Sequence, residues 1–244
     1  MNTKLDTLQL GAMYAERLAA SLPQVRRRIA EAAASVGRDP ASVRLVAVTK
    51  GHPVEALQAA VACGLADLGE NRVEELEDKV RFLGAHAATW HMIGHLQSRK
   101  APRAIRVADL IHSVDTLSLA ERVSRAAGEE DRQVRMLAQV NTSGEASKSG
   151  FDGEASVDAV LRMAALPHLK VEGLMTMAPF VDDEEVLTSA FRRLRETLDA
   201  VHSHDPRVGT ELSMGMTNDL EIAVREGSTM VRIGTALFGE RTAQ

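Results

Sequence analysis

The sequence has little of what several functional classes require. Its single cysteine, Cys63, cannot form an internal disulfide and stands before Gly64 at the end of an apolar helical run, which indicates helix packing. Aromatic residues make up only 3% of the chain, so base-stacking platforms for nucleic acid are not expected. No run of about 18 apolar residues, the length that spans a membrane, occurs. Because the N-terminal residues are too polar for a signal peptide, we expect a cytoplasmic protein.

What the chain does have suits an ordinary globular domain. It contains 244 residues with 45% hydrophobic content, enough to bury a full core. A net charge of −5 gives no general attraction to nucleic acid or to an anionic membrane surface. No linker rich in Pro, Gly or Ser divides the chain, so we expect one domain over residues 1–244.

The first 37 residues are predicted to be helical. Their apolar side chains recur at alternating spacings of four and three, which keeps them on one helix face: Leu18, Leu22, Val25, Ile29, Ala32 and Val36. Gly37 is the expected stop, with Pro40 beyond it.

From residue 43 onward, short apolar runs alternate with amphipathic helical stretches. The eight runs are VRLVAVT from Val43, ADLG from Ala66, WHMIG from Trp90, DLIHSV from Asp109, VRMLAQVN from Val134, VEGLMTM from Val171, TELSM from Thr210 and MVRIG from Met230. Parallel neighbours need such crossover helices. Eight repeats in about 200 residues predict a single (β/α)8 barrel of the TIM type, an α/β fold, with an added N-terminal helix.

In such a barrel the active site lies at the C-terminal ends of the strands. Polar or functional residues follow most of the runs at this point: Lys50, Asn71, His95, Asn141, Met177, Ser213 and residues 232–235. Lys50, at the end of LVAVTK, either extends into solvent or occupies a partly desolvated site. In the second case its pKa is depressed, and its amine can form a Schiff base with an aldehyde.

Two late loops offer an anion site that would complete this chemistry. Gly234 and Thr235 follow a strand, where small residues let backbone N–H groups approach a phosphate. Ser213 and Gly215 precede a helix. Together with Lys50, these loops indicate a phosphate-bearing aldehyde, and pyridoxal 5′-phosphate is the obvious candidate.

Eight ordered segments between about residue 22 and residue 241 resemble one known family. They are LVAVTK, LGENRVEE, WHMIGHLQSRK, VDTLSLAERV, QVNTSGEASKSGF, GLMTMAP, ELSMGMTNDLEIAV and GSTMVRIGTALFGER. In these segments the chain is similar to the pyridoxal phosphate homeostasis proteins, or YggS-type family. The resemblance implies a barrel like the N-terminal domain of alanine racemase and a role in binding, buffering and delivering vitamin B6 cofactor.

The resemblance also implies roles for individual residues. Lys50 would form the Schiff base with pyridoxal 5′-phosphate. The cofactor phosphate would be held by Ser213, Gly234 and Thr235, the pyridine nitrogen would face Arg232, and the ring pocket would include Asn71 and Met214.

The chain departs from the family pattern near these residues. Thr49, Gly51 and His52 surround Lys50, where family members usually read Ser-Lys-Thr-Lys-Pro, so a second lysine is missing. Arg72 replaces the usual tyrosine after Glu-Asn, and Thr217 stands where serine is common. We expect these changes to alter the rim of the pocket and to leave Lys50 in place.

The choice between carrier and enzyme depends on acid-base residues. Arg232 only donates hydrogen bonds, so opposite the pyridine nitrogen it would keep that nitrogen unprotonated and weaken the ring as an electron sink. Among proteins with a similar fold, alanine racemase works with two bases, the Schiff-base lysine and a tyrosine from a β-rich second domain. In this chain the only tyrosine is Tyr14, which lies outside the barrel pattern. We therefore expect a monomeric cofactor carrier, with recipient pyridoxal enzymes as possible partners. An amino-acid racemase using His95 or His52 as the second base is the alternative.

Three other motifs suggest different functions. His86, His91 and His95 could bind zinc, but the strand assignment and Gly94 separate their directions, so no metal site is expected. The loop from Ser143, SGEASKSG, lacks the glycine before Lys148 that a P-loop requires. The basic residues of RKAPRAIR suit either a nucleic-acid contact or, more commonly, a solvated face: Arg99, Lys100, Arg103 and Arg106.

Overall fold

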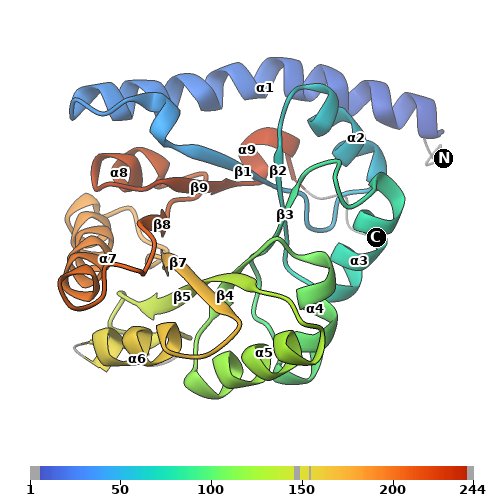
Figure 1. Cartoon of the computed structure of the whole chain (residues 1–244). Helices are drawn as coiled ribbons and strands as arrows, with labels where there is room; N and C mark the ends of the chain where they lie inside the picture. Colours follow the sequence, from blue (N-terminus) through green and yellow to red (C-terminus); the bar gives the residue numbers. More distant parts are fainter. Residues whose placement is uncertain (1–5, 146–148, 154, 241–244) are drawn as a thin grey trace.

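The computed structural model describes residues 6–145, 149–153 and 155–240. Within these residues the central sheet has the order β4-β3-β2-β1-β9-β8-β7-β5, and a further pairing of β4 with β5 closes it into a barrel (Figure 1). Every pairing is parallel. The barrel strands are β1 (Arg44–Val48), β2 (Asp67–Glu70), β3 (Thr89–Met92), β4 (Leu110–Val114), β5 (Val134–Asn141), β7 (Leu169–Met175), β8 (Glu211–Ser213) and β9 (Met230–Ile233).

Each of the eight predicted runs contains or overlaps one barrel strand, so the predicted barrel is confirmed. Even the short ADLG run overlaps β2, in which Leu68 is fully buried. The structure adds a two-residue strand, β6 (Phe151–Asp152), beside the end of β5. Its brevity explains why periodicity did not predict it.

Helices surround the barrel and turn their apolar faces toward it (Figure 1). They are α1 (Thr7–Ser35), α2 (Val54–Ala62), α3 (Val73–Leu83), α4 (Ala101–Val107), α5 (Leu117–Glu129), α6 (Ala155–Ala164), α7 (Glu184–His204), α8 (Leu220–Arg225) and α9 (Thr235–Phe238); the short 3₁₀ turns η1 (Pro40–Ser42) and η2 (Ser98–Lys100) precede β1 and α4.

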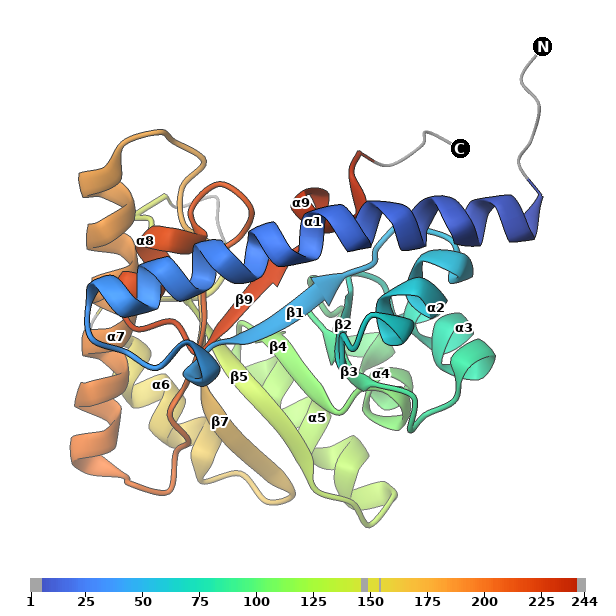
Figure 2. The same ribbon diagram turned by 90° about the horizontal axis from the view of Figure 1, so that it is seen from above.

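The added N-terminal helix covers a gap in this outer layer. The last helix, α9, has only 4 residues and is too short to cover β9 and β1. α1 runs across α2, α8 and α9 instead (Figure 2). It begins after the capping residue Asp6 and buries Leu18, Leu22 and Val25 on the predicted face. In addition, Arg17 Nη1 donates to the Phe238 carbonyl at 2.6 Å.

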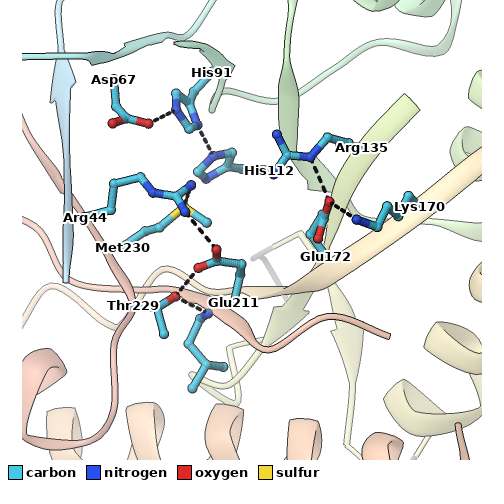
Figure 3. A network of polar contacts seen from close by, with 11 residues as sticks. Arg44, Asp67, His91, His112, Arg135, Lys170, Glu172, Glu211, Thr229 and Met230 are labelled. Atoms are coloured by element: carbon cyan, nitrogen blue, oxygen red, sulfur yellow. Dashed lines mark hydrogen bonds and ion pairs between the residues drawn. The ribbon is translucent and has the colours of Figure 1, made fainter. Parts of the chain in front are cut away.

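The two ends of the barrel interior differ in chemistry. Near the N-terminal ends of the strands, ion pairs cross between strands: Arg44 with Glu211 at 2.9 Å and Arg135 with Glu172 at 2.7 Å (Figure 3). The C-terminal ends of the strands open into a cavity, described below. No helix in the described ranges is both long and apolar enough to cross a membrane.

Candidate functional site

A cavity of about 370 Å³ lies at the C-terminal ends of the barrel strands, within the size range of small-molecule sites. It brings together five of the seven predicted cofactor residues: Lys50, Asn71, Arg232, Gly234 and Thr235. The other lining residues are Val48, Ile93, Gly94, His95, Gln139, Ser149, Met177, Ala178, Pro179, Phe180, Met216, Thr217, Asn218 and Asp219. The strand-end rule therefore predicted the position of this cavity from sequence.

Lys50 lies in the turn that follows β1 and is half-buried in the cavity wall. Gly51 has φ +70°, a left-handed conformation that glycine adopts without strain. Gly51, one of the departures from the family pattern, suits this backbone geometry. Gly51 N–H donates to Glu75 Oε1 at 2.6 Å, which ties the turn to α3.

A buried ionic cluster holds the backbone on both sides of Lys50. The Lys79 ammonium donates to the Thr49 carbonyl, to Glu70 Oε1 and to Glu75 Oε1, each at 2.7 Å. An ammonium has three N–H donors, so these contacts use its full capacity. The Thr49 hydroxyl donates to the same Glu70 oxygen. The chain entering and leaving Lys50 is thus fixed by one cation and two carboxylates, which we call the Lys79 clamp.

Burial gives the clamp an unusual protonation behaviour. Glu70 is fully buried, and this loss of hydration raises its pKa to about 7, although Lys79 and the Thr49 hydroxyl act in the opposite direction. Glu70 Oε2 has no hydrogen-bond partner among the described residues. The clamp therefore contains a carboxyl group that titrates near neutral pH.

Arg232 forms the floor of the cavity and is only 5% exposed. Its Nη1 donates to the carbonyl and the hydroxyl oxygen of Ser213 at 2.7 and 2.6 Å, and its Nη2 donates to the Thr176 carbonyl at 2.9 Å. Burial lowers its pKa to about 10, partly offset by Asp219, so the guanidinium stays charged at neutral pH. Among the described residues nothing accepts from its Nε–H, which leaves a donor for a ligand.

The remaining two predicted residues, Ser213 and Met214, are fully buried and are not part of the cavity lining. The Ser213 hydroxyl contacts Arg232 and His112 Nδ1, the latter at 2.9 Å. Direct contact of either residue with the cofactor stays a prediction. In this structure Ser213 contacts Arg232, which does line the cavity.

Residues from both predicted anion segments line the cavity, although Ser213 and Gly215, the residues predicted for the first segment, do not. Residues 216–219 and Gly234–Thr235 both line it, and the Ala236 N–H donates to the Thr217 hydroxyl at 3.4 Å. From α1, Arg28 Nη2 holds the Thr217 carbonyl at 2.8 Å. Thr217, named from sequence only as a departure, is therefore a lining residue with a hydroxyl close to Thr235.

Asn71 is placed by the close approach of Gly94. A Cβ at Gly94 would lie 2.4 Å from the Asn71 carbonyl oxygen, so only glycine fits this position. Arg72, the other departure in this segment, is exposed and is not part of the cavity lining.

Sequence reasoning missed Gln139 and, in the loop after β7 where Met177 was expected at the rim, residues 178–180. Gln139 Nε2 donates to the Ser149 carbonyl at 3.0 Å, and both residues line the cavity. Alternation along β5 places Gln139 on the same face as Asn141, a signal that could have found it. Phe180, in the loop, lines the cavity mouth and is 91% exposed, a placement that no strand or helix pattern predicts.

The histidines singled out as a possible zinc site point to different partners. His91 is fully buried with Nε2 2.9 Å from Asp67 Oδ1, whereas His95 is at the cavity with Nδ1 3.2 Å from Asp115. His86 is exposed. In the described part of the chain, no group of three or more His, Cys, Asp or Glu side chains is arranged for a metal ion.

The other motifs also have local partners. In the basic segment, Lys100 pairs with Glu74, Arg103 with Glu77 and Arg106 with Glu130, which partly neutralises its charge. Of the SGEASKSG loop, residues 146–148, including Lys148, lie outside the described residues. Tyr14 lies away from the cavity lining, and its hydroxyl is 3.0 Å from His52 Nδ1.

Known proteins share the fold and much of the sequence of this chain. Residues 20–242 match the family model for the alanine racemase N-terminal domain. The chain is 42% identical, over 92% of its length and 96% of the relative, to the pyridoxal phosphate homeostasis protein of Pseudomonas aeruginosa.

Two solved structures extend the comparison. PipY of Synechococcus elongatus, solved with PLP (pyridoxal 5′-phosphate) bound, is 39% identical to this chain. The match covers 86% of this chain and 100% of that chain, with a TM-score of 0.76. Alanine racemase from Corynebacterium glutamicum, 17% identical, has a TM-score of 0.68 with 91% of this chain and 63% of that chain covered, which shows a shared fold. The chain belongs to the pyridoxal phosphate homeostasis protein family, whose barrel is that of the alanine racemase N-terminal domain.

Proposed function

We propose that this protein binds pyridoxal 5′-phosphate at Lys50 and takes part in intracellular vitamin B6 homeostasis. The observation that carries the proposal is the convergence of Lys50, Arg232 and the Gly234–Thr235 loop on one cavity. The relatives named pyridoxal phosphate homeostasis proteins and the PLP-bound PipY structure support it.

The residues present fit the cofactor in three respects. The cavity contains an amine for the aldehyde, a charged guanidinium with an unused Nε–H for the pyridine nitrogen, and a hydroxyl-lined loop pair for the phosphate. The aldehyde supplies a reversible Schiff base linkage to the amine. The Lys79 clamp fixes the backbone that carries this amine, and Thr217 and Thr235 provide donors on the phosphate side.

Arg232 favours storage of the cofactor over catalysis. A guanidinium only donates hydrogen bonds, so it keeps a facing pyridine nitrogen unprotonated, and an unprotonated ring is a weaker electron sink. Tyr14, the only tyrosine, contacts His52 outside the cavity lining. A non-enzymatic role, delivery to recipient enzymes, a monomeric state and a cytoplasmic location belong to the same proposal.

Reductive trapping tests the binding step. The full chain is incubated with pyridoxal 5′-phosphate, its near-ultraviolet and visible absorbance is recorded, and borohydride is added before peptide mapping. We expect the reduced cofactor mass on the peptide containing Lys50 and no specific label in Lys50→Ala. Lys100→Ala, which removes a lysine paired with Glu74 on the outer surface, should label as the wild type does. A protein that stays colourless and unlabelled contradicts the proposal.

One observation favours a test of the racemase alternative. His95 lines the same cavity and has Asp115 as a partner, the arrangement of a general base. The loaded protein is therefore incubated with L-alanine in deuterated water, and α-proton exchange is followed by NMR. A carrier shows little exchange; rapid exchange that is lost in both Lys50→Ala and His95→Gln assigns an enzymatic function.

A further inference from the structure

A continuous line of buried polar side chains crosses the barrel interior toward Arg232. Asp67 at the start of β2 is 2.9 Å from His91 Nε2, and His91 Nδ1 is 2.8 Å from His112 Nε2 on β4 (Figure 3). His112 Nδ1 is 2.9 Å from the Ser213 hydroxyl, which Arg232 Nη1 contacts at 2.6 Å. The two histidines and Ser213 are fully buried. These five side chains form what we call the interior relay.

With both rings neutral, the chemistry of the two ends assigns one direction to every hydrogen bond in the relay. A guanidinium has no acceptor, so Arg232 donates to Ser213 Oγ. The Ser213 hydroxyl hydrogen then has one acceptor among its described partners, His112 Nδ1. An unprotonated Nδ1 means that His112 is neutral with its proton on Nε2. Burial, together with the charges of neighbouring groups, lowers the pKa of His112 well below its usual value, in agreement with a neutral ring.

The same logic continues to the far end. His112 Nε2–H donates to His91 Nδ1, which leaves His91 with its proton on Nε2, and this N–H donates to Asp67 Oδ1. A carboxylate only accepts, so the relay terminates there with each ring nitrogen and the hydroxyl satisfied. Because all the bonds run one way, each polarises the next, and the carboxylate strengthens Ser213 as an acceptor for Arg232.

We propose that Asp67, His91 and His112 are positioning residues for Arg232. Through Ser213 they orient the guanidinium at the cavity floor. Ser213 and Arg232 lie between these three residues and any bound ligand. The inference rests on the proposed function only where it concerns the cofactor, because the hydrogen bonds of the relay are present in the protein without it. Its consequence for binding is that the donor facing the pyridine nitrogen is aligned before the cofactor enters.

Histidine NMR on the full chain without cofactor tests the relay directly. In protein labelled with ¹⁵N at histidine, His91 and His112 are assigned by comparison with single variants. We expect both rings to be neutral near pH 7.5, with the proton on Nε2 in each. A charged His91, or a proton on Nδ1 of either ring, overturns the proposed direction whether or not the protein binds cofactor.

Matched substitutions test the coupling to the cavity. Asp67→Asn keeps an acceptor for His91 and removes the charge, whereas Asp67→Leu removes both. We expect pyridoxal 5′-phosphate to bind about threefold more weakly in Asp67→Asn and about tenfold more weakly in Asp67→Leu, with a shifted absorption maximum of the bound cofactor. Glu172→Gln is the control, because Glu172 also carries an interior charge but pairs with Arg135 and Lys170 outside the relay.

The outcomes separate the relay from the proposed function. Unchanged affinity and absorbance in both Asp67 variants, with wild-type binding intact, overturns the positioning role and leaves cofactor binding standing. Equal effects in Glu172→Gln overturn it as well, because any interior charge would then suffice. If the wild type itself binds no cofactor, the proposed function fails. The histidine NMR experiment then still shows whether the hydrogen bonds of the relay run in the proposed direction.

Discussion

The two basic residues of the cavity, Lys50 and Arg232, are held by different described contacts. Around Lys50, the Lys79 clamp grips the backbone of Thr49 and Gly51. Around Arg232, the contacts are made with the guanidinium itself, by Ser213 and Thr176. Under the proposed function, a fixed backbone suits the residue that forms the covalent bond, and a fixed guanidinium suits the residue that recognises the ring nitrogen.

The largest effect should follow from breaking the clamp. Lys79→Met leaves two carboxylates, one fully buried, without their cation, so we expect a loss of about 3–5 kcal/mol in the free energy of unfolding. Urea denaturation measures it. Arg81→Met on the same helix removes an exposed pair with Asp78 and should change stability by less than about 1 kcal/mol. Equal losses of unfolding free energy in the two variants would show that the Lys79 clamp stabilises the fold no more than an exposed ion pair does.

Two hydroxyl deletions compare the two supports directly. Thr49→Val removes a donor to Glu70, and Ser213→Ala removes the link between Arg232 and His112. Each should cost about 1–3 kcal/mol of stability, since each leaves a buried polar partner short of a bond. Only Ser213→Ala should shift the absorption maximum of bound pyridoxal 5′-phosphate. A shifted absorption maximum in Thr49→Val but not in Ser213→Ala would contradict this assignment, in which Ser213 supports the Arg232 side chain and Thr49 supports the backbone beside Lys50.

The clamp should also give stability a pH dependence. Because burial raises the pKa of Glu70 from 4.5 to about 7, the folded state binds more protons than the unfolded state between these values. The contribution of Glu70 therefore favours folding at low pH and is lost as the pH rises through 7. Relative to wild type, Glu70→Gln should remove a negative slope of at most about 1.4 kcal/mol per pH unit. Urea denaturation from pH 5 to pH 7.5 tests this; parallel curves would contradict it.

The smallest effect concerns the outer side of the Lys50 turn. Tyr14→Phe removes the hydroxyl bound to His52 and should cost about 1 kcal/mol of stability. Affinity for pyridoxal 5′-phosphate should not change, because Tyr14 is not part of the cavity lining. Thermal denaturation and absorbance titration measure the two properties. A clear drop in affinity would mean that α1 sets the geometry of the turn.

The sequence predicted the fold well because the barrel depends on patterns that are local. Alternating apolar runs and helical stretches fixed the strands, and the strand-end rule then placed Lys50 and Arg232 in one site. The predicted phosphate-binding role of Gly234 and Thr235, which both line the cavity, came from small residues after a strand, also a local signal. Met177 was expected at the rim for the same reason.

The supporting contacts were not predictable in this way. Lys79 and Thr49 are 30 positions apart, and His112 and Ser213 are 101 apart. Whether such side chains meet depends on barrel closure and register, which periodicity does not encode. Ser213 shows the limit: the motif identified an important residue, but only the structure shows that its hydroxyl contacts Arg232 and His112.

The position of α1 has a consequence for biosynthesis. The first helix contacts the last: Arg17 binds the Phe238 carbonyl, and Ser21 binds that of Leu237. β1 pairs with β9, and Arg232, Gly234 and Thr235 come from β9 and the residues directly after it. During synthesis, neither the barrel nor the cavity can therefore form until residue 235 has left the ribosome, long after Lys50. Under the proposed function, a ribosome-bound chain would acquire the complete binding site only at that point.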